Sequence, residues 1–385
     1  MLFQMGAMQM QTFIRGFLVY ELTESPTLLG VVASAMSIPI VTFGLFGGVL
    51  ADRLDKRRLI QVAQVLSLVI ALALAVSISI GAITWVHLLL ASVAQGFAIA
   101  IMMPTRQAVI PQLVPKEQLT NAIALNAMGM SIVMMITPAM GGVLVGVIGV
   151  EGVYYLMTGM YGCAIVLTVF LPKLDKPVDS DGRGMFRDLI DGLRYVRGDR
   201  RIRLLLMLAF ATVLFSEPLR SILPVFAKDV FGVGSRGLGI MLSMMGGGSL
   251  IGAFAIASGG KVEGQGLRLL LTSLFSGSMF IGFGLVSSFA PAFWLGGVFL
   301  VIIGATMPIR MTLNNSLVLG YADPRYRGRV MGLFFMSFGL VPAAMLPLGL
   351  LTDAIGAPMA VTAMAGCMIV LVGTLFAVSP VLRRS

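Results

Sequence analysis

Charged residues are scarce in this sequence. Only 11% of its 385 residues are Asp, Glu, Lys or Arg, whereas 58% are hydrophobic and the mean hydropathy is +0.97. A water-soluble domain carries about a quarter charged residues, which keep its surface in solution. The shortage of charge therefore excludes an ordinary soluble domain and indicates that lipid surrounds most of the chain.

Residues that build catalytic and metal centres are also few. The sequence has one histidine and two cysteines, Cys163 and Cys367, which lie far apart in apolar runs. This pattern does not predict a disulfide framework, a zinc site or a redox site. The sequence also has no G-x-x-x-x-G-K-[ST] phosphate loop and no catalytic constellation. We therefore expect neither an enzyme nor a bound cofactor.

What the sequence does have is a series of long apolar runs. A helix that crosses a bilayer needs about 20 mostly apolar residues. Twelve such runs alternate with charged or Gly- and Pro-rich turns, near residues 1–20, 27–50, 59–79, 85–104, 121–148, 152–171, 204–227, 236–259, 268–288, 292–316, 329–351 and 357–379. The sequence thus predicts an all-α polytopic membrane protein with twelve transmembrane helices.

Lysine and arginine are distributed unevenly between the two sides of these spans. With a cytoplasmic N-terminus, the inner loops and the C-terminal tail hold 22 of the 27 basic residues, and the outer loops hold two. The positive-inside rule then places both termini in the cytoplasm. The net charge of +10 is explained by this orientation, because the charges sit in short turns and form no continuous face for nucleic acid.

The longest polar stretch divides the spans into two groups of six. We predict an N-terminal half at 1–171, a cytoplasmic linker at 172–203 and a C-terminal half at 204–385. Within the linker, residues 185–197 place apolar side chains at helical spacing opposite a charged face, which predicts an amphipathic helix on the inner membrane surface. Two six-helix halves are typical of a transporter.

Several short motifs carry a resemblance to a known family. Segment 48–58 reads GVLADRLDKRR and is similar to the G-x-L-a-D-r-x-G-r-r motif of the major facilitator superfamily, with Asp55 in place of the second glycine. PTRQA at 104–108, PQLVP at 111–115, LPVFAKDV at 223–230 and RGRVMG at 327–332 resemble its multidrug, macrolide and siderophore exporter branch. The likeness extends over nearly the whole chain and implies two pseudo-symmetric halves.

In that superfamily the turn after helix 2 is thought to latch the two halves on the cytoplasmic side. The resemblance implies that Asp52 faces the N-terminus of helix 11, where a helix carries about half a positive charge. The gating motif comprises Gly48, Asp52, Arg53, Lys56, Arg57 and Arg58. The alternative is that these basic residues only set the membrane topology.

A second motif lies in the fifth span. Thr137, Pro138, Gly141 and Gly142 are similar to the family's G-P-x-x-G-G antiporter motif, with Thr137 in place of the first glycine. The resemblance implies export, whereas small residues also serve ordinary close helix packing. In the fourth span Ser92 stands where drug–proton antiporters usually have an arginine. If protons drive transport, another residue must sense them.

Four ionisable residues lie inside the spans, at an insertion cost of about 2.5–3.5 kcal/mol each, so they are functional candidates. Glu217 and Arg220 are three residues apart and therefore share a helix face, where they can pair. Pro218 between them favours a kink. The pair either binds substrate or responds to protonation, or it is a structural ion pair.

The other two are arginines. Arg310, with Asn314 one turn further along, lies near the inner end of the tenth span, and we expect its guanidinium to snorkel to the interface, with cavity lining as the alternative. Arg15 lies near Gln11 in the first span, and we expect it to face inward because lipid exposure is costly. The resemblance implies that this helix lines the cavity.

Together these features predict a secondary active transporter that works by alternating access in the bacterial inner membrane. The favoured activity is proton-driven efflux of small amphipathic or lipophilic compounds of the drug or siderophore type. Its partners are then the substrate, protons and the lipid bilayer, without nucleic acid, and we expect a monomer. The alternatives are an uptake symporter on the same fold and a transport-dead receptor or scaffold. A truncated first helix is a further alternative, because the family usually has more chain ahead of Gly16.

Overall fold

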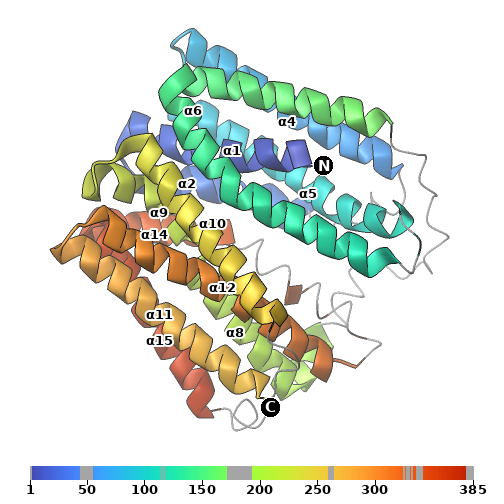
Figure 1. The fold of residues 1–385 in the computed structure, drawn as a ribbon, viewed down its shortest axis with the longest axis vertical. Helices are drawn as coiled ribbons and strands as arrows, with labels where there is room; N and C mark the ends of the chain where they lie inside the picture. The colour runs from blue at the N-terminus through green and yellow to red at the C-terminus, as the bar shows by residue number, and fades with distance from the viewer. Residues whose placement is uncertain are drawn as a thin grey trace. The chain divides into compact units, whose positions relative to one another are not determined.

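The computed structural model describes residues 2–43, 55–113, 115, 118–170, 193–258, 264–323, 326, 330, 333–334 and 341–378. Regular structure in these ranges is entirely helical (Figure 1), which confirms the predicted all-α class. The helices are α1 (Leu2–Thr23), α2 (Pro26–Ala35), α4 (Lys56–Ser79), α5 (Trp85–Leu113), α6 (Leu119–Val169), α8 (Arg200–Ser216), α9 (Leu219–Val225), the π-helix η2 (Phe226–Val230), α10 (Gly234–Ser258), α11 (Gln265–Phe289), α12 (Phe293–Tyr321), α14 (Val341–Ile355) and α15 (Ala357–Val378).

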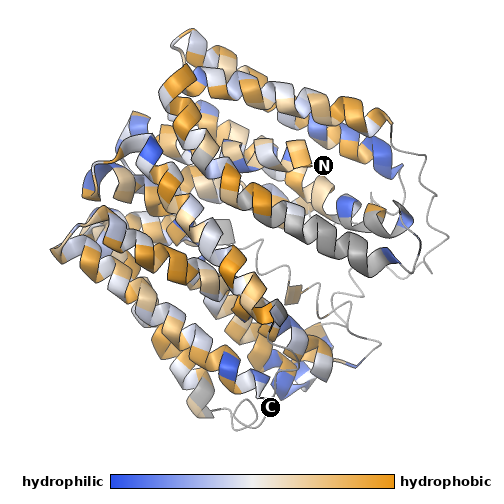
Figure 2. Ribbon diagram, viewed as in Figure 1, coloured by the Kyte–Doolittle hydropathy of each residue, from blue (hydrophilic) through white to orange (hydrophobic). Residues whose placement is uncertain are grey.

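Many of these helices are suited to a bilayer. Within the described ranges, nine are long and apolar enough to cross a membrane. The segment Ala344–Ile355 is shorter, and α1 is not among the nine because its glutamines and Arg15 lower its hydropathy. Figure 2 shows hydrophobic residues along the helices and hydrophilic ones mainly near their ends. The total of twelve spans stays a prediction that this architecture is consistent with.

Two helix interruptions fall where the sequence places them. In α6, Gly149 adopts φ 72° and ψ 171°, a conformation open to glycine, and it separates the predicted spans 121–148 and 152–171. In the seventh span α8 ends at Ser216, a turn follows at Glu217 and Pro218, and α9 begins at Leu219. Proline lacks the N–H that would continue the helix, which explains the break.

The chain divides into two compact units, which we describe separately. Unit 1 contains Met1–Gly182 together with Val233–Ser243, and unit 2 contains Arg183–Gly232 together with Met244–Ser385. Of the predicted amphipathic helix, residues 193–198 are helical and its earlier part lies outside the described residues. The predicted boundaries of the two halves and the linker stay a prediction.

In unit 1, helix α1 packs closely against α6, and α4 packs against both α5 and α6 (Figure 1). More than half of α1 is buried, and its buried side chains include Gln4, Gln11 and Arg15. A helix with polar residues on a buried face must satisfy them inside the protein, because lipid offers no hydrogen-bond partner. The polar interior of unit 1 is therefore built around α1.

In unit 2, α11 packs along α15 and α12 (Figure 1). The core at one end of this unit is apolar and comes from α8, α11, α12 and α15, with Leu205, Leu208, Val318 and Val372 fully buried. Glycines bring α10 and α12 into backbone contact, since a Cβ added at Gly248 would lie 1.9 Å from the Val301 carbonyl oxygen. Such close crossings are typical of membrane helices.

Candidate functional site

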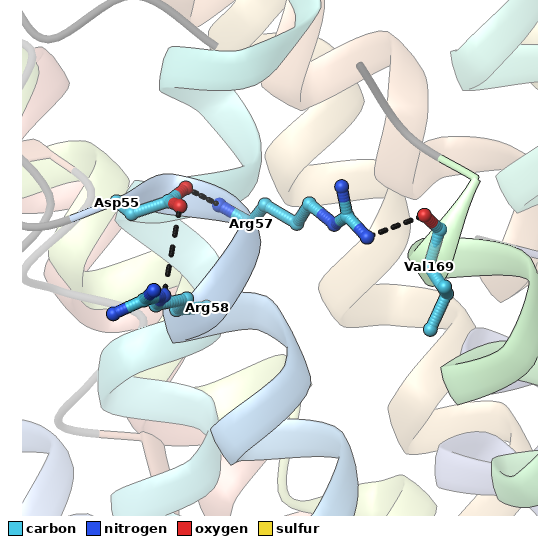
Figure 3. Close-up of polar contacts among 4 residues, drawn as sticks. All are labelled: Asp55, Arg57, Arg58 and Val169. Atoms are coloured by element: carbon cyan, nitrogen blue, oxygen red, sulfur yellow. Dashed lines mark hydrogen bonds and ion pairs between the residues drawn. The ribbon is translucent and has the colours of Figure 1, made fainter. Parts of the chain in front are cut away.

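The start of α4 contains the described part of the gating motif (Figure 3). The carboxylate of Asp55 accepts a hydrogen bond from the Arg57 backbone N–H at 2.9 Å, so it caps the helix. Asp55 Oδ2 also lies 3.9 Å from the exposed Arg58 guanidinium, and the Arg57 side chain donates to the Val169 carbonyl at the end of α6. The aspartate that replaces the family's second glycine thus has a local structural role.

The rest of this motif is only partly described. Lys56 is buried in α4, with 3% of its surface exposed. The predicted residues Gly48, Asp52 and Arg53 lie outside the described residues. The cytoplasmic latch therefore stays a prediction.

The helix-5 motif lies in α6 at a close packing contact. Thr137 and Pro138 are buried, and a Cβ added at Gly141 would lie 3.0 Å from the Phe13 ring of α1. A Cβ at Gly142 would lie 2.6 Å from the Ser235 carbonyl oxygen, within the part of α10 that belongs to unit 1. The two glycines therefore serve helix packing, and the implied link to export stays a prediction.

Polar side chains connect the helices inside unit 1. Gln64 of α4 donates to Gln4 Oε1 of α1 at 3.1 Å and to Thr168 Oγ1 of α6 at 3.0 Å. Gln11 lies further along α1, and its Oε1 accepts a hydrogen bond from the Tyr161 hydroxyl of α6 at 2.9 Å. Hydrogen bonds between helices are a regular means of joining them in membranes. Here they fix α1 against α4 and α6.

Arg15 lies one turn beyond Gln11 on the same face of α1 and is 4% exposed, as the sequence predicted. One guanidinium nitrogen, NH2, lies 3.8 Å from the Met36 sulfur, and NH1 has no hydrogen-bond partner among the described residues. Tyr154 and Tyr161 of α6 are within electrostatic reach. Arg15 is therefore a buried cation surrounded by neutral groups.

Glu217 and Arg220 of the seventh span do not form the direct ion pair that the sequence predicted. Glu217 and Arg220 are both half-buried, but no ion pair within 4.0 Å joins Glu217 to a described residue. The backbone keeps right-handed helical dihedral angles through Glu217 and Pro218, and the Arg220 N–H donates to the Glu217 carbonyl oxygen at 3.2 Å, yet the two charged groups do not meet. Arg220 and Arg310 both act on Glu217 at longer range. The direct pairing was wrong, and an electrostatic cluster takes its place.

The position of the Arg310 side chain also differs from the one that the sequence predicted. Its side chain is 6% exposed and donates from NH2 to the Ser216 hydroxyl at 3.2 Å. The prediction that it snorkels to the interface is wrong, because the negative charge of Glu217 and the hydroxyl of Ser216 hold it inside unit 2. Asn314, one turn along α12, donates to the Leu205 carbonyl oxygen at 3.2 Å and ties α12 to α8.

Some residues of these sites were not singled out from the sequence. Two of them form hydrogen bonds between helices of unit 1, namely Gln64 and Tyr161. The other two are neighbours of Arg15, namely Tyr154 and Met36. A signal was available for Gln64, since a glutamine within an apolar span needs an internal partner. The tyrosines and Met36 resemble ordinary apolar filling, and their role depends on contacts between distant segments.

Comparison with known proteins decides the family. The sequence profile of the transmembrane secretion effector family, a branch of the major facilitator superfamily, matches residues 2–384. The chain belongs to this family. It is therefore a multi-pass membrane transporter of the major facilitator type, and it is not an enzyme.

Curated relatives of this transporter share about a quarter of its residues. A staphyloferrin A transporter of Staphylococcus aureus is 26% identical over 334 residues, which cover 85% of this chain and 81% of the relative. A macrolide efflux protein A of Streptococcus pyogenes is 24% identical over 348 residues, with 88% and 83% covered. An enterobactin exporter of Shigella boydii is 23% identical over 316 residues, with 82% and 74% covered.

Solved structures agree on the fold. The transporter superimposes on a nucleoside transporter, NupG, with a TM-score of 0.77 at 17% identity, and 98% of each chain is covered. A peptide transporter crystallised with alafosfalin gives a TM-score of 0.77 at 15% identity, with 100% of this chain and 93% of that chain covered. These likenesses establish the major facilitator fold.

Proposed function

We propose that this transporter exports small amphipathic or lipophilic compounds of the drug or siderophore type, driven by the proton gradient through alternating access. The relatives described above are named for macrolide efflux, enterobactin export and staphyloferrin A transport. Their matches extend over most of each chain, which supports efflux over uptake. The proposed location is the bacterial inner membrane with both termini in the cytoplasm, supported by the basic inner loops.

The observation that carries proton coupling is the setting of Glu217. Glu217 lies in the middle of the span Arg200–Val230, whereas the other acidic residue of that span, Asp229, lies at its end. The Glu217 side chain is half-buried. The charges of Arg220 and Arg310 act on it, but no described residue forms an ion pair with it within 4.0 Å. A carboxylate in this position is able to take up and release a proton without first breaking a direct ion pair.

Protonation of Glu217 changes the electrostatics of unit 2. The ionised carboxylate attracts Arg310, whose guanidinium also bonds to Ser216 at the end of α8. The protonated, neutral form loses this attraction, so the turn at Pro218, which carries Glu217, is held less strongly to helix α12, which carries Arg310. A change of this kind biases a two-state equilibrium only by the difference in energy that it creates between the states. Glu217 would thereby couple proton movement to the conformational change.

The direction of transport is tested in membrane vesicles of both orientations. Vesicles come from an efflux-deficient bacterial host that expresses the chain or an empty vector. The probes are Hoechst 33342, ethidium and radiolabelled erythromycin, with a proton gradient generated by respiration. We expect one or more probes to accumulate in everted vesicles, and an uncoupler to abolish the accumulation. Gradient-dependent accumulation in right-side-out vesicles alone would show an uptake symporter instead.

The cytoplasmic latch is tested in the same vesicles. Asp52→Asn removes the charge proposed to face helix 11 and should slow accumulation, while the amount of inserted protein stays at the wild-type level. Asp55→Asn is the matched control, because an asparagine still caps α4. Equal rates for wild type and Asp52→Asn would leave the basic turn with a topological role only.

A further inference from the structure

Arg15 is a buried cation for which the described part of the chain supplies no counter-charge. It is 4% exposed, and no ion pair within 4.0 Å joins it to an acidic side chain of those residues. The titratable groups within electrostatic reach of it are the hydroxyls of Tyr154 and Tyr161, which carry no charge while they hold their protons. A buried charge without a partner is costly, so a residue of this kind in a membrane span is a candidate for binding a charged ligand.

Two further residues near Arg15 have unused hydrogen-bond groups: Gln11, one turn earlier on the same face of α1, and Tyr154, which is within electrostatic reach. Arg15 NH1, Gln11 Nε2 and the Tyr154 hydroxyl are all buried and have no partner among the described residues. Gln11 is held in place because its other amide atom, Oε1, accepts from the Tyr161 hydroxyl at 2.9 Å. NH1 and Nε2 are obligate donors, and a tyrosine hydroxyl donates readily. The ligand that satisfies all three at once is an acceptor with several oxygen atoms.

The remaining contact of Arg15 is weak. Its NH2 group lies 3.8 Å from the thioether sulfur of Met36, and a thioether is a poor acceptor for a guanidinium. Met36 follows the end of α2 at Ala35, where the membrane span Pro26–Phe43 is interrupted. The Met36 carbonyl oxygen lies so close to α5 that a Cβ added at Gly96 would be 2.5 Å away. Met36 thus occupies a helix break beside the guanidinium.

We propose that Arg15, Gln11 and Tyr154 form a binding site for the carboxylate of a transported compound, with Met36 as the group that the carboxylate displaces. This inference rests on the proposed function, since it names a substrate class for the same transporter. A carboxylate fits because it presents two oxygens to a guanidinium in a bidentate arrangement and accepts further hydrogen bonds. A cationic group is disfavoured at this position, because it would add a second positive charge beside Arg15.

A purely structural role for Arg15 is the competing explanation. A structural arginine in a membrane interior forms hydrogen bonds to neighbouring helices, as Arg310 does with Ser216. Arg310 Nε and NH1 also have no partner among the described residues, but Arg310 NH2 bonds to a hydroxyl, whereas Arg15 NH2 contacts only sulfur and Arg15 NH1 has no partner there. Arg15 therefore contributes little to holding α1 in place. Its NH1 group remains a hydrogen-bond donor that a ligand can use.

The test uses the purified full chain in detergent and a pair of probes that differ in charge. The probes are 2-naphthoate and its neutral counterpart 2-naphthamide, and binding is measured by isothermal titration calorimetry. The wild type should bind 2-naphthoate at least tenfold more tightly than 2-naphthamide. Arg15→Gln should remove this preference, whereas Arg268→Gln, at an exposed position in α11, should keep it. A wild type that binds 2-naphthoate no more tightly than 2-naphthamide overturns the proposal.

A second variant keeps Arg15 and so remains informative if Arg15→Gln does not fold. Met36→Glu supplies a carboxylate from within the chain, next to the guanidinium. It should lower the affinity for 2-naphthoate at least tenfold and raise the melting temperature above that of Met36→Gln, the neutral control of the same length. Wild-type affinity for 2-naphthoate in Met36→Glu would contradict the site.

The binding measurement requires no proton gradient and no knowledge of transport direction. A chain that fails to export any probe but binds 2-naphthoate through Arg15 would contradict the proposed function and retain the carboxylate site. A chain that exports erythromycin and shows no preference between the naphthalene probes would support the proposed function and contradict the carboxylate site.

Discussion

The two buried arginines, Arg15 in unit 1 and Arg310 in unit 2, occupy opposite electrostatic environments. Arg310 is attracted by Glu217 and donates to Ser216. Arg15 is surrounded by neutral groups and contacts the Met36 sulfur. Residues of the same type and similar burial thus serve different purposes. We propose that one belongs to an internal charge cluster that responds to protonation, and that the other binds a charge that arrives with a ligand.

The helices of the two units are also joined by different means. In unit 1, side-chain hydrogen bonds such as those of Gln64 connect α4 with α1 and α6. In unit 2, glycines place the backbone of α10 against that of α12, with Gly248 facing Val301 and Gly252 facing Ala305. Polar contacts can exchange partners at low cost, whereas glycine contacts allow little change in distance. Substitutions should therefore affect the two units unequally.

The largest effect is expected for Gly248→Ala in unit 2. The added methyl group would lie 1.9 Å from the Val301 carbonyl oxygen, so α10 and α12 must separate and lose their packing. We expect a strong loss of monodisperse protein in size-exclusion chromatography after detergent extraction. Gly247→Ala is the matched control, since no atom lies within 4 Å of its added Cβ. Equal yields of the two variants would show that the close crossing is not needed.

The next largest effect separates the two arginines directly. Arg310→Met removes a cation that Glu217 attracts and that donates to the Ser216 hydroxyl, so the melting temperature should fall. Arg15→Met removes a cation that has no acidic partner among the described residues, so the melting temperature should stay unchanged or rise. Thermal unfolding in detergent checks both. A larger loss of stability for Arg15→Met than for Arg310→Met would reverse the comparison.

A double substitution sharpens the role of Glu217 in this contrast. Glu217→Gln together with Arg310→Met removes both charges, so the double variant should be more stable than Arg310→Met alone, although Arg220 still acts on this position. The transport rate of Glu217→Gln alone should also lose the dependence on pH that the wild type shows, because the amide cannot take up a proton. A wild-type pH profile in Glu217→Gln would remove this residue from coupling.

The smallest effect is expected for the polar contacts of unit 1. Gln64→Leu removes two side-chain hydrogen bonds, and such bonds between membrane helices contribute about 0.6 kcal/mol each on average. The melting temperature should fall slightly with transport preserved. Gln61→Leu, on the same helix, is the control because no hydrogen bond joins its side chain to another described residue. A loss as large as that of Gly248→Ala would contradict the proposed difference between the units.

The sequence was sufficient for the class, the fold and the family. Few charges, long apolar runs and the GVLADRLDKRR turn predicted a helical transporter of the major facilitator superfamily, which the fold and the family match confirm. Helix breaks at Gly149 and Pro218 were also visible, because these residue types impose their own backbone geometry.

The sequence was not sufficient for the partners of the buried charges. Arg310 bonds to Ser216, 94 residues away, and Arg15 contacts Met36, 21 residues away. Helical periodicity relates only residues within a turn or two, so it favoured Arg220 as the direct partner of Glu217. The place of Arg310 near the inner end of its span favoured the interface. The contact of Arg310 with Ser216 on another helix overruled that second expectation.

Proton coupling through Glu217 is tested most directly by following protons and compound together. Everted vesicles are acidified by respiration, the acidic lumen is monitored with acridine orange, and a compound that the vesicles accumulate is then added. We predict that the compound releases protons from the lumen with the wild type, and that Glu217→Gln at equal membrane abundance releases none. Accumulation of the compound without proton release, or equal release with Glu217→Gln, would contradict proton coupling through this residue.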